Sequence, residues 1–369
     1  MAYFSNNYKN LRFPKATAEN PGLRNAQIGA IHAIGQHFTL HDTEPALVVM
    51  PTGSGKTAVL TIAPFLLQAR RVLVISSSKL VRGQINEKIG TLSTLKHIGV
   101  FAKDHEAPNI KEIKSMLTSI EDWGELTNYD LVIGLPQSLS AGFEDGIIPP
   151  EDLFDLVLVD EAHHKPADTW SAIVEKFRLA KKVFFTATPF RRDNKEIKGT
   201  LVYSYPLSSA YSDGIFGEVG YYAVNAEGLT QNEKDILIAQ KTEEIFQVDR
   251  AAGLDHFIMV RTKLKNHADE LARIYKENTN LNLKVIHSSH TYGHIKSTIK
   301  KLERGELDGI ICVNMLAEGF DFPNLKIGAI HEHHKSLAVT LQFIGRFART
   351  NAPNIGSAKF IAAESDIAV

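Results

Sequence analysis

Residues 46–57 read ALVVMPTGSGKT and predict a strand, a tight turn and a helix in the first part of the chain. Four aliphatic residues lead directly into a turn that contains Gly53 and Gly55 and is followed by Lys56. A strand that ends in such a turn and opens a helix points consecutive backbone N–H groups, and the positive end of the helix dipole, at one place. Because only an anion is stabilised there, we predict a phosphate-binding loop.

The two residues that close the loop have the chemistry of a nucleotide site. Lys56 is placed to reach the outer phosphates, and the Thr57 hydroxyl is placed to coordinate Mg²⁺. The generic motif begins with glycine, whereas this chain has Met50 there. A glycine-rich turn with a chance lysine is the alternative, and the motifs found further along the chain weigh against it. The residues expected to contact ATP here are Pro51, Thr52, Gly53, Ser54, Gly55, Lys56 and Thr57.

Composition is that of a soluble globular protein. The chain has 369 residues, of which 44% are hydrophobic and 22% charged, which is enough for two domains with separate cores. With a net charge of −1, a polyanion partner would be held by a local basic groove rather than by the overall field. The single cysteine, Cys312, excludes disulfides and cysteine-zinc sites. Without a signal pattern or an apolar run of membrane-spanning length, we expect a cytoplasmic protein with no membrane anchor.

Short, continuous apolar runs recur between longer mixed segments. Such runs favour strands covered on both faces by helices, which is parallel α/β architecture. Pro206, Gly214 and Gly217 interrupt the pattern, so we expect two domains, at 1–212 and 213–369. Pro64 should kink or end the helix that follows the phosphate loop. The runs lie at 72–75, 131–133, 156–159, 183–185, 257–260, 285–286, 310–313 and 360–363.

Two adjacent carboxylates, Asp160 and Glu161, follow the apolar run at 156–159. Ligands of open α/β sheets bind at the carboxyl ends of strands. Asp160 is placed to hold Mg²⁺ through water, and Glu161 to orient and deprotonate the water that attacks the γ-phosphate. By itself such a pair is more often a solvated helix start. Paired with a phosphate loop, it favours a nucleotide-hydrolysing site.

Three later stretches extend the pattern: TATP at 186–189 followed by Arg191, EGFDFP at 318–323, and QFIGRFAR at 342–349. With the phosphate loop and DEAHH at 160–164, they resemble, in the right order, the motifs of helicase superfamily two, the DEAD/DEAH-type helicases. The resemblance is closest to the bacterial branch of type III restriction translocases and XPB-like proteins, and it covers nearly the whole chain. It implies two tandem RecA-like parallel-sheet domains with ATP bound in the cleft between them.

The resemblance also assigns roles outside the phosphate loop. Arg24 and Gln27 would bind adenine, and Arg346 and Arg349, three residues apart on one helix face, would reach the γ-phosphate as arginine fingers. Gly319 and Asp321 would approach the nucleotide from the second domain. Coupling to the nucleic-acid groove would fall to His163, Thr186, Thr188 and Gln342. For His163, a plain core hydrogen bond is an equal alternative.

The nucleic-acid groove is where the chain departs most from the family pattern. Ser77 and Ser78 replace the usual Pro-Thr, Gly134 and Leu135 replace the threonine before Pro-Gln-Ser-Leu, and Val313 replaces the threonine of the fifth motif. Hydroxyls and backbone N–H groups can still hold phosphates, which carry no sequence information. The groove residues implied are Ser77, Ser78, Gln84, Gln137, Ser138, Ser288 and Ser289.

Two histidine clusters could suggest a metal site. The first contains His287, His290 and His294, and the second contains the histidines at 331, 333 and 334. Neither has a cysteine or a convincing fourth ligand nearby, so we expect neutral or hydrogen-bonded histidines rather than zinc.

These observations predict an ATP- and Mg²⁺-dependent motor that binds nucleic acid, with DNA favoured over RNA, in restriction, repair or antiphage defence. An effector such as a nuclease is the expected partner, because no nuclease constellation follows the sixth motif. A regulatory ATP-dependent switch that does not unwind is the alternative from another class, which the absent threonines favour. An RNA helicase differs only in substrate.

Overall fold

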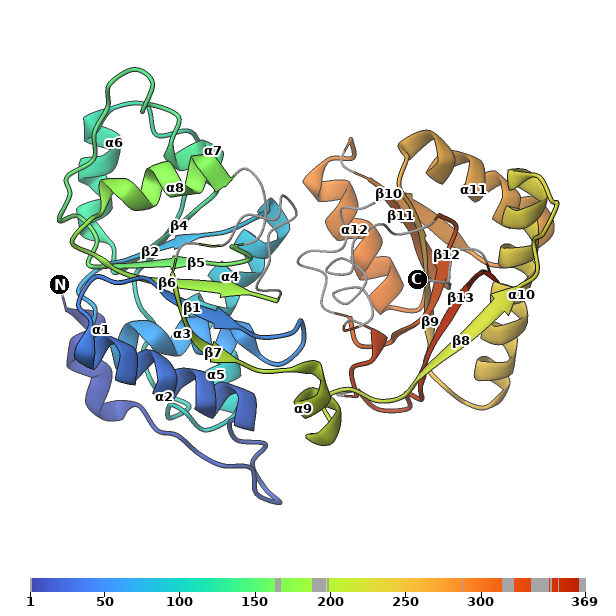
Figure 1. The fold of residues 1–369 in the computed structure, drawn as a ribbon, viewed down its shortest axis with the longest axis horizontal. Helices are drawn as coiled ribbons and strands as arrows, with labels where there is room; N and C mark the ends of the chain where they lie inside the picture. The colour runs from blue at the N-terminus through green and yellow to red at the C-terminus, as the bar shows by residue number, and fades with distance from the viewer. Residues whose placement is uncertain are drawn as a thin grey trace. The chain divides into compact units, whose positions relative to one another are not determined.

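The computed structural model describes residues 2–162, 167–187, 197, 199–287, 289–313, 322–332, 345, 347–350 and 352–364. The chain divides into two compact units, Met1–Ala210 and Tyr211–Val369 (Figure 1). The division lies two residues before the 212/213 boundary expected from the sequence. Each unit is built on its own sheet.

In the described part of the first unit, seven strands form one sheet in the order β3-β4-β2-β5-β6-β1-β7, and every pairing is parallel. The central strands are buried along their whole length because helices cover both faces. The strands are β1 (Ala46–Val49), β2 (Val72–Ile75), β3 (Ile110–Glu112), β4 (Leu131–Gly134), β5 (Leu156–Val159), β6 (Lys181–Thr186) and β7 (Thr200–Ser204).

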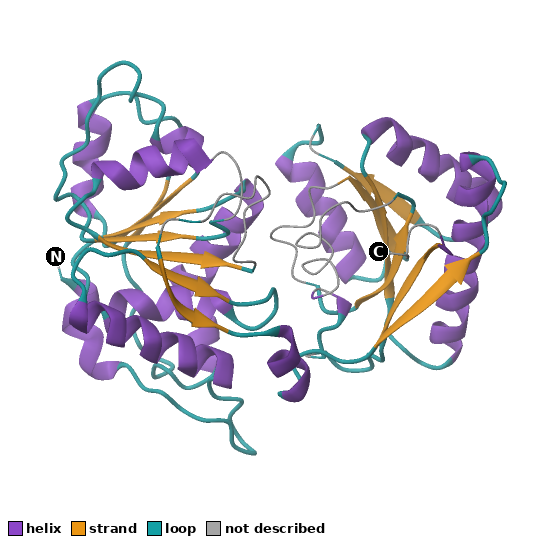
Figure 2. Ribbon diagram, in the orientation of Figure 1, coloured by secondary structure: helices purple, strands orange, loops and turns teal. Residues whose placement is uncertain are grey.

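Helices pack on the two faces of this sheet (Figure 2). One face packs against Trp123 of α6 and Trp170 of α8, where alternate strand residues such as Leu73 and Val157 point. Pro64 lies in α3, and that helix ends two residues later, as expected. The helices of this unit are α1 (Tyr3–Asn7), α2 (Asn25–Leu40), α3 (Lys56–Leu66), α4 (Lys79–Thr91), α5 (Ser93–His97), α6 (Ile120–Glu125), α7 (Pro136–Leu139) and α8 (Ala167–Lys176), with short 3₁₀ turns at Tyr8–Asn10 and Leu126–Asn128. Helix α9 (Leu207–Ser212) crosses the division between the units.

In the described part of the second unit, six strands form a second parallel sheet in the order β10-β11-β9-β12-β13-β8. Helices α10 (Gln231–Ala251) and α11 (Lys265–Asn278) pack on one face, where Phe246 and Leu271 meet Val260 and Ile311, and α12 (Tyr292–Glu303) lies on the other (Figure 1). The strands are β8 (Val219–Val224), β9 (Phe257–Thr262), β10 (Leu283–Ile286), β11 (Gly309–Val313), β12 (Leu325–Ile330) and β13 (Ala358–Ala363). Two parallel α/β domains, as the sequence predicts, are therefore confirmed.

Gly309 lies where two neighbouring strands of the second sheet leave no room for a side chain. A Cβ at this position would lie 2.3 Å from the backbone oxygen of Ile258 on the neighbouring strand. A backbone oxygen held in a sheet cannot move away as a flexible side chain could. Gly309→Ala should therefore destabilise the unit by about 1–3 kcal/mol. Gly293→Ala is the matched control, because Gly293 lies in α12 with open space around it, and alanine there should stabilise by about 0.5–1 kcal/mol. Thermal unfolding of both variants measures the two signs, and an unchanged Gly309→Ala midpoint would contradict this packing.

Candidate nucleotide site and a second polar network

The predicted nucleotide residues of the first unit gather at one edge of its sheet. Strands β2, β5, β6 and β1 are neighbours and parallel, so their carboxyl ends lie side by side. The loop at 50–55 follows β1, Asp160 follows β5, and Thr186 is the last residue of β6. Residues more than a hundred positions apart in the sequence therefore share one site.

The phosphate loop has a conformation that its glycines allow. Gly53 and Gly55 both have φ of +95°, and Gly55 is the N-cap of α3. The Ser54 hydroxyl is buried and donates to the Pro51 carbonyl at 2.7 Å, which closes the turn internally. Met50 is fully buried, and its N–H donates to the Thr186 carbonyl at 2.9 Å. The side chain that replaces the usual glycine is thus accommodated in the core below the loop.

Lys56 joins the loop to the two acidic residues. Its ammonium donates to the Glu161 carboxylate, and it lies 3.5 Å from Oδ1 of Asp160. Burial disfavours the charged lysine, but attraction by Glu161 and then by Asp160 outweighs it and raises the pKa of Lys56. Burial raises the pKa of Asp160 despite the attraction of Lys56. The cluster thus holds a buried ammonium beside two carboxylates.

Glu161 has an unusual backbone. Its φ of +54° lies in the left-handed region, which costs energy for a residue with a Cβ. The flanking backbone is fixed, because the Asp160 N–H donates to the Ile75 carbonyl at 3.0 Å and the Ala162 N–H to Phe185 at 2.9 Å. Neighbouring strands therefore hold Glu161 in a strained conformation, as is common at functional sites.

Arg24 and Gln27, expected to bind adenine, lie against the phosphate loop. Nη1 of Arg24 donates to the Gly53 carbonyl at 2.6 Å, and Nε2 of Gln27 donates to the Gly55 carbonyl at 3.3 Å. Oε1 of Gln27 accepts from the Arg24 N–H at 2.9 Å at the start of α2. Both side chains thus join the start of α2 to the loop, and their contact with adenine stays a prediction.

The groove residues predicted for the first unit lie after β2 and β4, at the same edge. The Ser78 hydroxyl accepts from the Val81 N–H at 3.3 Å and caps α4. The hydroxyl of Ser77 is buried and has no hydrogen-bond partner among the described residues. Gln84 is half-buried in α4, Gln137 is exposed in α7, and Ser138 follows it. In the second unit, Ser289 is exposed and accepts from Lys265 at 2.7 Å.

Several predicted residues lie outside the described residues: His163, Thr188, Ser288, Gly319, Asp321, Gln342 and Arg346. Arg349 is described, and it corrects one expectation. We expected it on the same helix as Arg346, but its backbone forms an antiparallel bridge with Phe216 and its side chain is buried. Its neighbours Gly345 and Phe347 are helical, so the helix ends before Arg349, where the chain pairs with the segment that enters the second unit.

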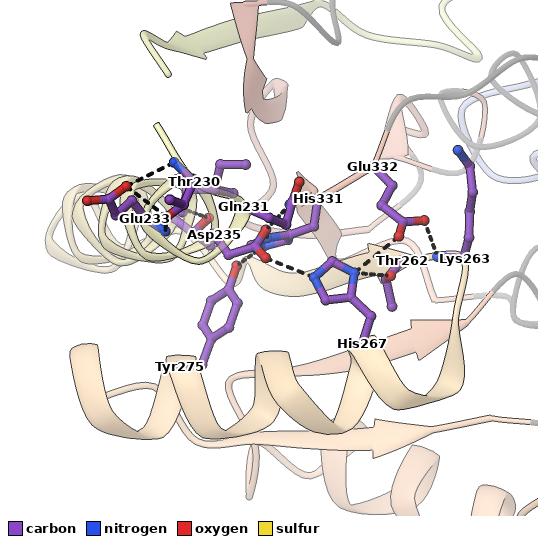
Figure 3. A network of polar contacts seen from close by, with 12 residues as sticks. Thr230, Gln231, Glu233, Asp235, Thr262, Lys263, His267, Tyr275, His331 and Glu332 are labelled. Carbon is purple, nitrogen blue, oxygen red and sulfur yellow. Dashed lines mark hydrogen bonds and ion pairs between the residues drawn. The ribbon is translucent and has the colours of Figure 1, made fainter. Parts of the chain in front are cut away.

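Figure 3 shows a buried polar network in the second unit that the motifs do not predict. Asp235 of α10 accepts from Nδ1 of His331 at 2.7 Å and from Nε2 of His267 at 2.8 Å. Nε2 of His331 accepts from the Tyr275 hydroxyl at 3.0 Å, and Nδ1 of His267 donates to Thr262 at 2.8 Å and to Glu332 at 3.3 Å. The network joins α10 and α11 to the carboxyl ends of β9 and β12. His331 was singled out from the sequence, but its partners lie too far along the chain to be recognised there.

Burial and charge set the protonation of this network. Despite its burial, hydrogen bonds from His267 and His331 lower the pKa of Asp235 to about 2. The hydrogen bond to Asp235 raises the pKa of His267, whereas burial lowers the pKa of His331. At neutral pH, therefore, a charged Asp235 binds one histidine that favours its proton and one that remains neutral.

The described residues contain no group of three or more histidine, cysteine, aspartate or glutamate side chains arranged for a metal ion. The hard oxygen donors Thr57 and Asp160 nevertheless fit Mg²⁺ held partly by phosphates and water, which needs few protein ligands. Within the same described part of the chain, none of the helices has the length and apolar character needed to cross a membrane.

Two family models match the chain. Residues 20–191 match "Type III restriction enzyme, res subunit", and residues 229–351 match "Helicase conserved C-terminal domain". The first match contains the phosphate loop, Asp160 and Glu161. The second contains Asp235, His331 and Arg349.

Individual relatives have low sequence identity, but the similarity extends over most of this chain. The chain is 22% identical to "Putative helicase 22" of Sulfolobus islandicus filamentous virus over 93% of this chain and 64% of the viral protein. It is 24% identical to "Probable ATP-dependent RNA helicase ddx52" of Dictyostelium discoideum over 81% of this chain and 44% of that protein. The chain thus spans less than two thirds of either relative.

Solved structures show the same fold. A fragment of a "putative HsdR subunit of a type I restriction enzyme" from Vibrio vulnificus YJ016 superposes with a TM-score of 0.64 at 19% identity, covering 95% of this chain and 65% of that one. At this identity the likeness concerns the fold alone. It confirms the predicted class of two RecA-like α/β domains.

The polar network predicts a pH-dependent stability. Asp235→Asn leaves two histidines without their buried carboxylate and should cost about 3–5 kcal/mol near neutral pH. Because the folded-state pKa of His267 is raised, its contribution is full below its ordinary pKa of 6.5 and is lost as the pH rises through the raised value. His331 acts in the same direction, since loss of the carboxylate lowers its pKa further. The difference in thermal unfolding between wild type and Asp235→Asn should therefore be larger at about pH 6 than at about pH 9.

Glu332→Gln is the matched control for this measurement. Its carboxylate contacts His267 at 3.3 Å but is partly exposed, so the change should cost under about 1 kcal/mol. A gap between wild type and Asp235→Asn that does not vary with pH would contradict the assigned charges.

Proposed function

Because the chain belongs to helicase superfamily two and its first unit is related to the res subunits of restriction enzymes, we propose that it is an ATP-dependent motor acting on nucleic acid. The observation that carries the proposal is the contact of Lys56 with Asp160 and Glu161 at adjacent strand ends. A phosphate loop and an acidic pair in contact form the minimum set for hydrolysis of a nucleoside triphosphate.

The geometry suggests how the residues act. Lys56 binds the β- and γ-phosphates, and this draws its ammonium away from Glu161. Glu161 then accepts a proton from the water whose oxygen attacks the γ-phosphorus, while the bond to the ADP oxygen breaks. Thr57 and Asp160 would hold Mg²⁺, which supplies charge neutralisation at the phosphates. The strained backbone of Glu161 supports this role, because it fixes the carboxylate before ATP arrives.

The second unit completes the site in this proposal. Arg346 and Arg349 neutralise the charge that develops on the transferring phosphoryl group, and Gly319 and Asp321 contact the nucleotide. Such arginines contribute roughly 10³ to 10⁵ in turnover in related chemistry. ATP binds between the units, and each hydrolysis cycle changes how they grip one strand. His163, Thr186, Thr188 and Gln342 transmit the nucleotide state.

DNA is the favoured substrate, and restriction, repair or antiphage defence the favoured setting, with an effector such as a nuclease as partner. The match of residues 20–191 to a restriction-enzyme subunit supports this choice. The groove would be formed by Ser77, Ser78, Gln84, Gln137, Ser138, Ser288 and Ser289. An RNA helicase is the second candidate, which the similarity to an RNA helicase of Dictyostelium favours. A switch that binds without unwinding is the third.

The proposal predicts Mg²⁺-dependent ATP hydrolysis that nucleic acid stimulates. Turnover is measured against single-stranded and duplex DNA and RNA, with strand displacement measured on the same substrates. Glu161→Gln removes the base but keeps the side-chain size, so it should lower turnover by at least about 10² while ATP still binds. The control Glu112→Gln changes a carboxylate that pairs with Arg82 in the same unit, and it should keep near-normal turnover.

Each outcome selects among the candidates. Stimulation by DNA supports the favoured substrate, stimulation only by RNA supports the second candidate, and binding without strand displacement or translocation supports the switch. Hydrolysis by Glu161→Gln at the wild-type rate would show that Glu161 is not the base.

A further inference from the structure

Lys326 of β12 is a fully buried lysine whose partners are backbone carbonyls. Only 1% of it is exposed. Its ammonium donates to the Phe347 carbonyl at 2.7 Å and to the Arg349 carbonyl. Among the described residues, no carboxylate lies within ion-pair distance of Lys326. Lysines are rarely buried without an acidic partner, because taking the charge out of water is costly.

The two carbonyls belong to the segment of the predicted arginine fingers. Residues 345 and 347 are helical and residue 348 is a turn, so these carbonyls lie where the helix ends. Carbonyls at the end of a helix lack partners within the helix and carry the negative end of its dipole. A lysine placed there satisfies both carbonyls and is favoured by their partial charges.

The same segment is held from its other side by the chain that enters the second unit. The Gly217 N–H donates to the Ala348 carbonyl at 2.6 Å, and Phe216 bridges to Arg349. The Thr350 hydroxyl donates to the Gly214 carbonyl at 2.7 Å. Lys326 therefore provides the sheet-side half of a clamp on residues 347–350.

We propose that Lys326 is a positioning residue for ATP hydrolysis, which fixes the backbone at Phe347 and Arg349. The inference rests on the proposed function, because it needs Arg346 or Arg349 to act at the γ-phosphate. Arginine fingers depend on placement, and a displacement of about 1 Å can cost on the order of 10² in rate. Lys326 itself touches neither ATP nor the reacting water in this role.

The positioning role of Lys326 should also depend on pH, because the side chain can lose its proton in the accessible range. Burial, and then repulsion by Arg349, lower its pKa to about 8. Lys326 also acts on His256, whose ring pairs with Asp249 of α10, and Lys359 pairs with the same carboxylate. A charged donor makes a hydrogen bond roughly twice as strong as a neutral one. The clamp should therefore weaken as the pH rises through about 8.

The test compares Lys326→Met with a matched control, Lys182→Met. Lys182 is also a buried lysine bonded only to carbonyls among the described residues, of Arg178 at 3.0 Å and Ala180 at 2.8 Å. It lies at the start of β6, at the opposite end of its strand from the nucleotide residues of its own unit. Lys326→Met should lower kcat at pH 7 by about tenfold or more, with the Kd for ATP within about twofold. Lys182→Met should keep near-normal kcat. Thermal unfolding shows whether each variant is folded.

The pH profile separates positioning from general damage. The ratio of wild-type kcat to Lys326→Met kcat should fall as the pH rises from about 7 to about 9.5, because the wild-type lysine loses its proton near pH 8. Lys326→Arg keeps the charge and the donors, so it should retain turnover within about threefold of wild type at pH 7. Because arginine stays charged, the ratio of Lys326→Arg kcat to Lys326→Met kcat should not fall between about pH 7 and about pH 9.5. If Lys326→Met does not fold, wild-type kcat is compared with Lys326→Arg kcat over the same pH range, and only the wild-type value should fall as Lys326 loses its proton.

The outcomes distinguish this inference from the function beneath it. Folded Lys326→Met with the kcat of Lys182→Met, or a ratio that stays constant with pH, overturns the positioning role while the motor stands. A wild-type chain that binds nucleic acid and ATP but never hydrolyses ATP overturns the proposed function, and the positioning role with it.

Discussion

Parallel strand pairing is the constraint on which both units depend. In a parallel sheet the carboxyl ends of all strands lie at the same edge, so each loop that leaves a strand opens beside its neighbours. In the first unit this places the phosphate loop beside the residues that follow β5 and β6. In the second it places Thr262 beside His331 and Glu332. The chemistry of each unit is therefore assembled from residues that follow different strands.

The fold was predictable where burial leaves a mark on the sequence. Every continuous apolar run named from the sequence is a strand, because a strand covered on both faces must be apolar throughout. Three of the strands outside these runs, β3, β7 and β8, lie at sheet edges. Their residues are largely half-buried or exposed, as in the Tyr221 and Tyr222 pair of β8, so no continuous apolar run marks them. Only the backbone pairing identifies such strands.

The site was predictable to the extent that its chemistry is local in sequence. The phosphate loop and the Asp160–Glu161 pair are short contiguous motifs, and the strand order brings them into contact. Asp235 carries no such signal, since it is one charged residue in a helix that is polar overall, and its partners are 32 and 96 positions away. The burial of Lys326 could not be predicted either, because a single lysine in an otherwise apolar strand usually marks an exposed position. The buried charged residues of the second unit could therefore be recognised only from the structure.

The pairing of the arginine segment with residues 214–217 also has a mechanical consequence. These residues stand between α9 and the first strand of the second unit, so they are the stretch through which tension along the chain enters that unit. A pulling force would meet the Gly217 and Thr350 hydrogen bonds before it reached β8. The backbone at residues 348–350 would therefore bear a load applied through the chain before β8 does. In the proposed motor, a load on the chain would therefore act directly on the segment proposed to contact the γ-phosphate.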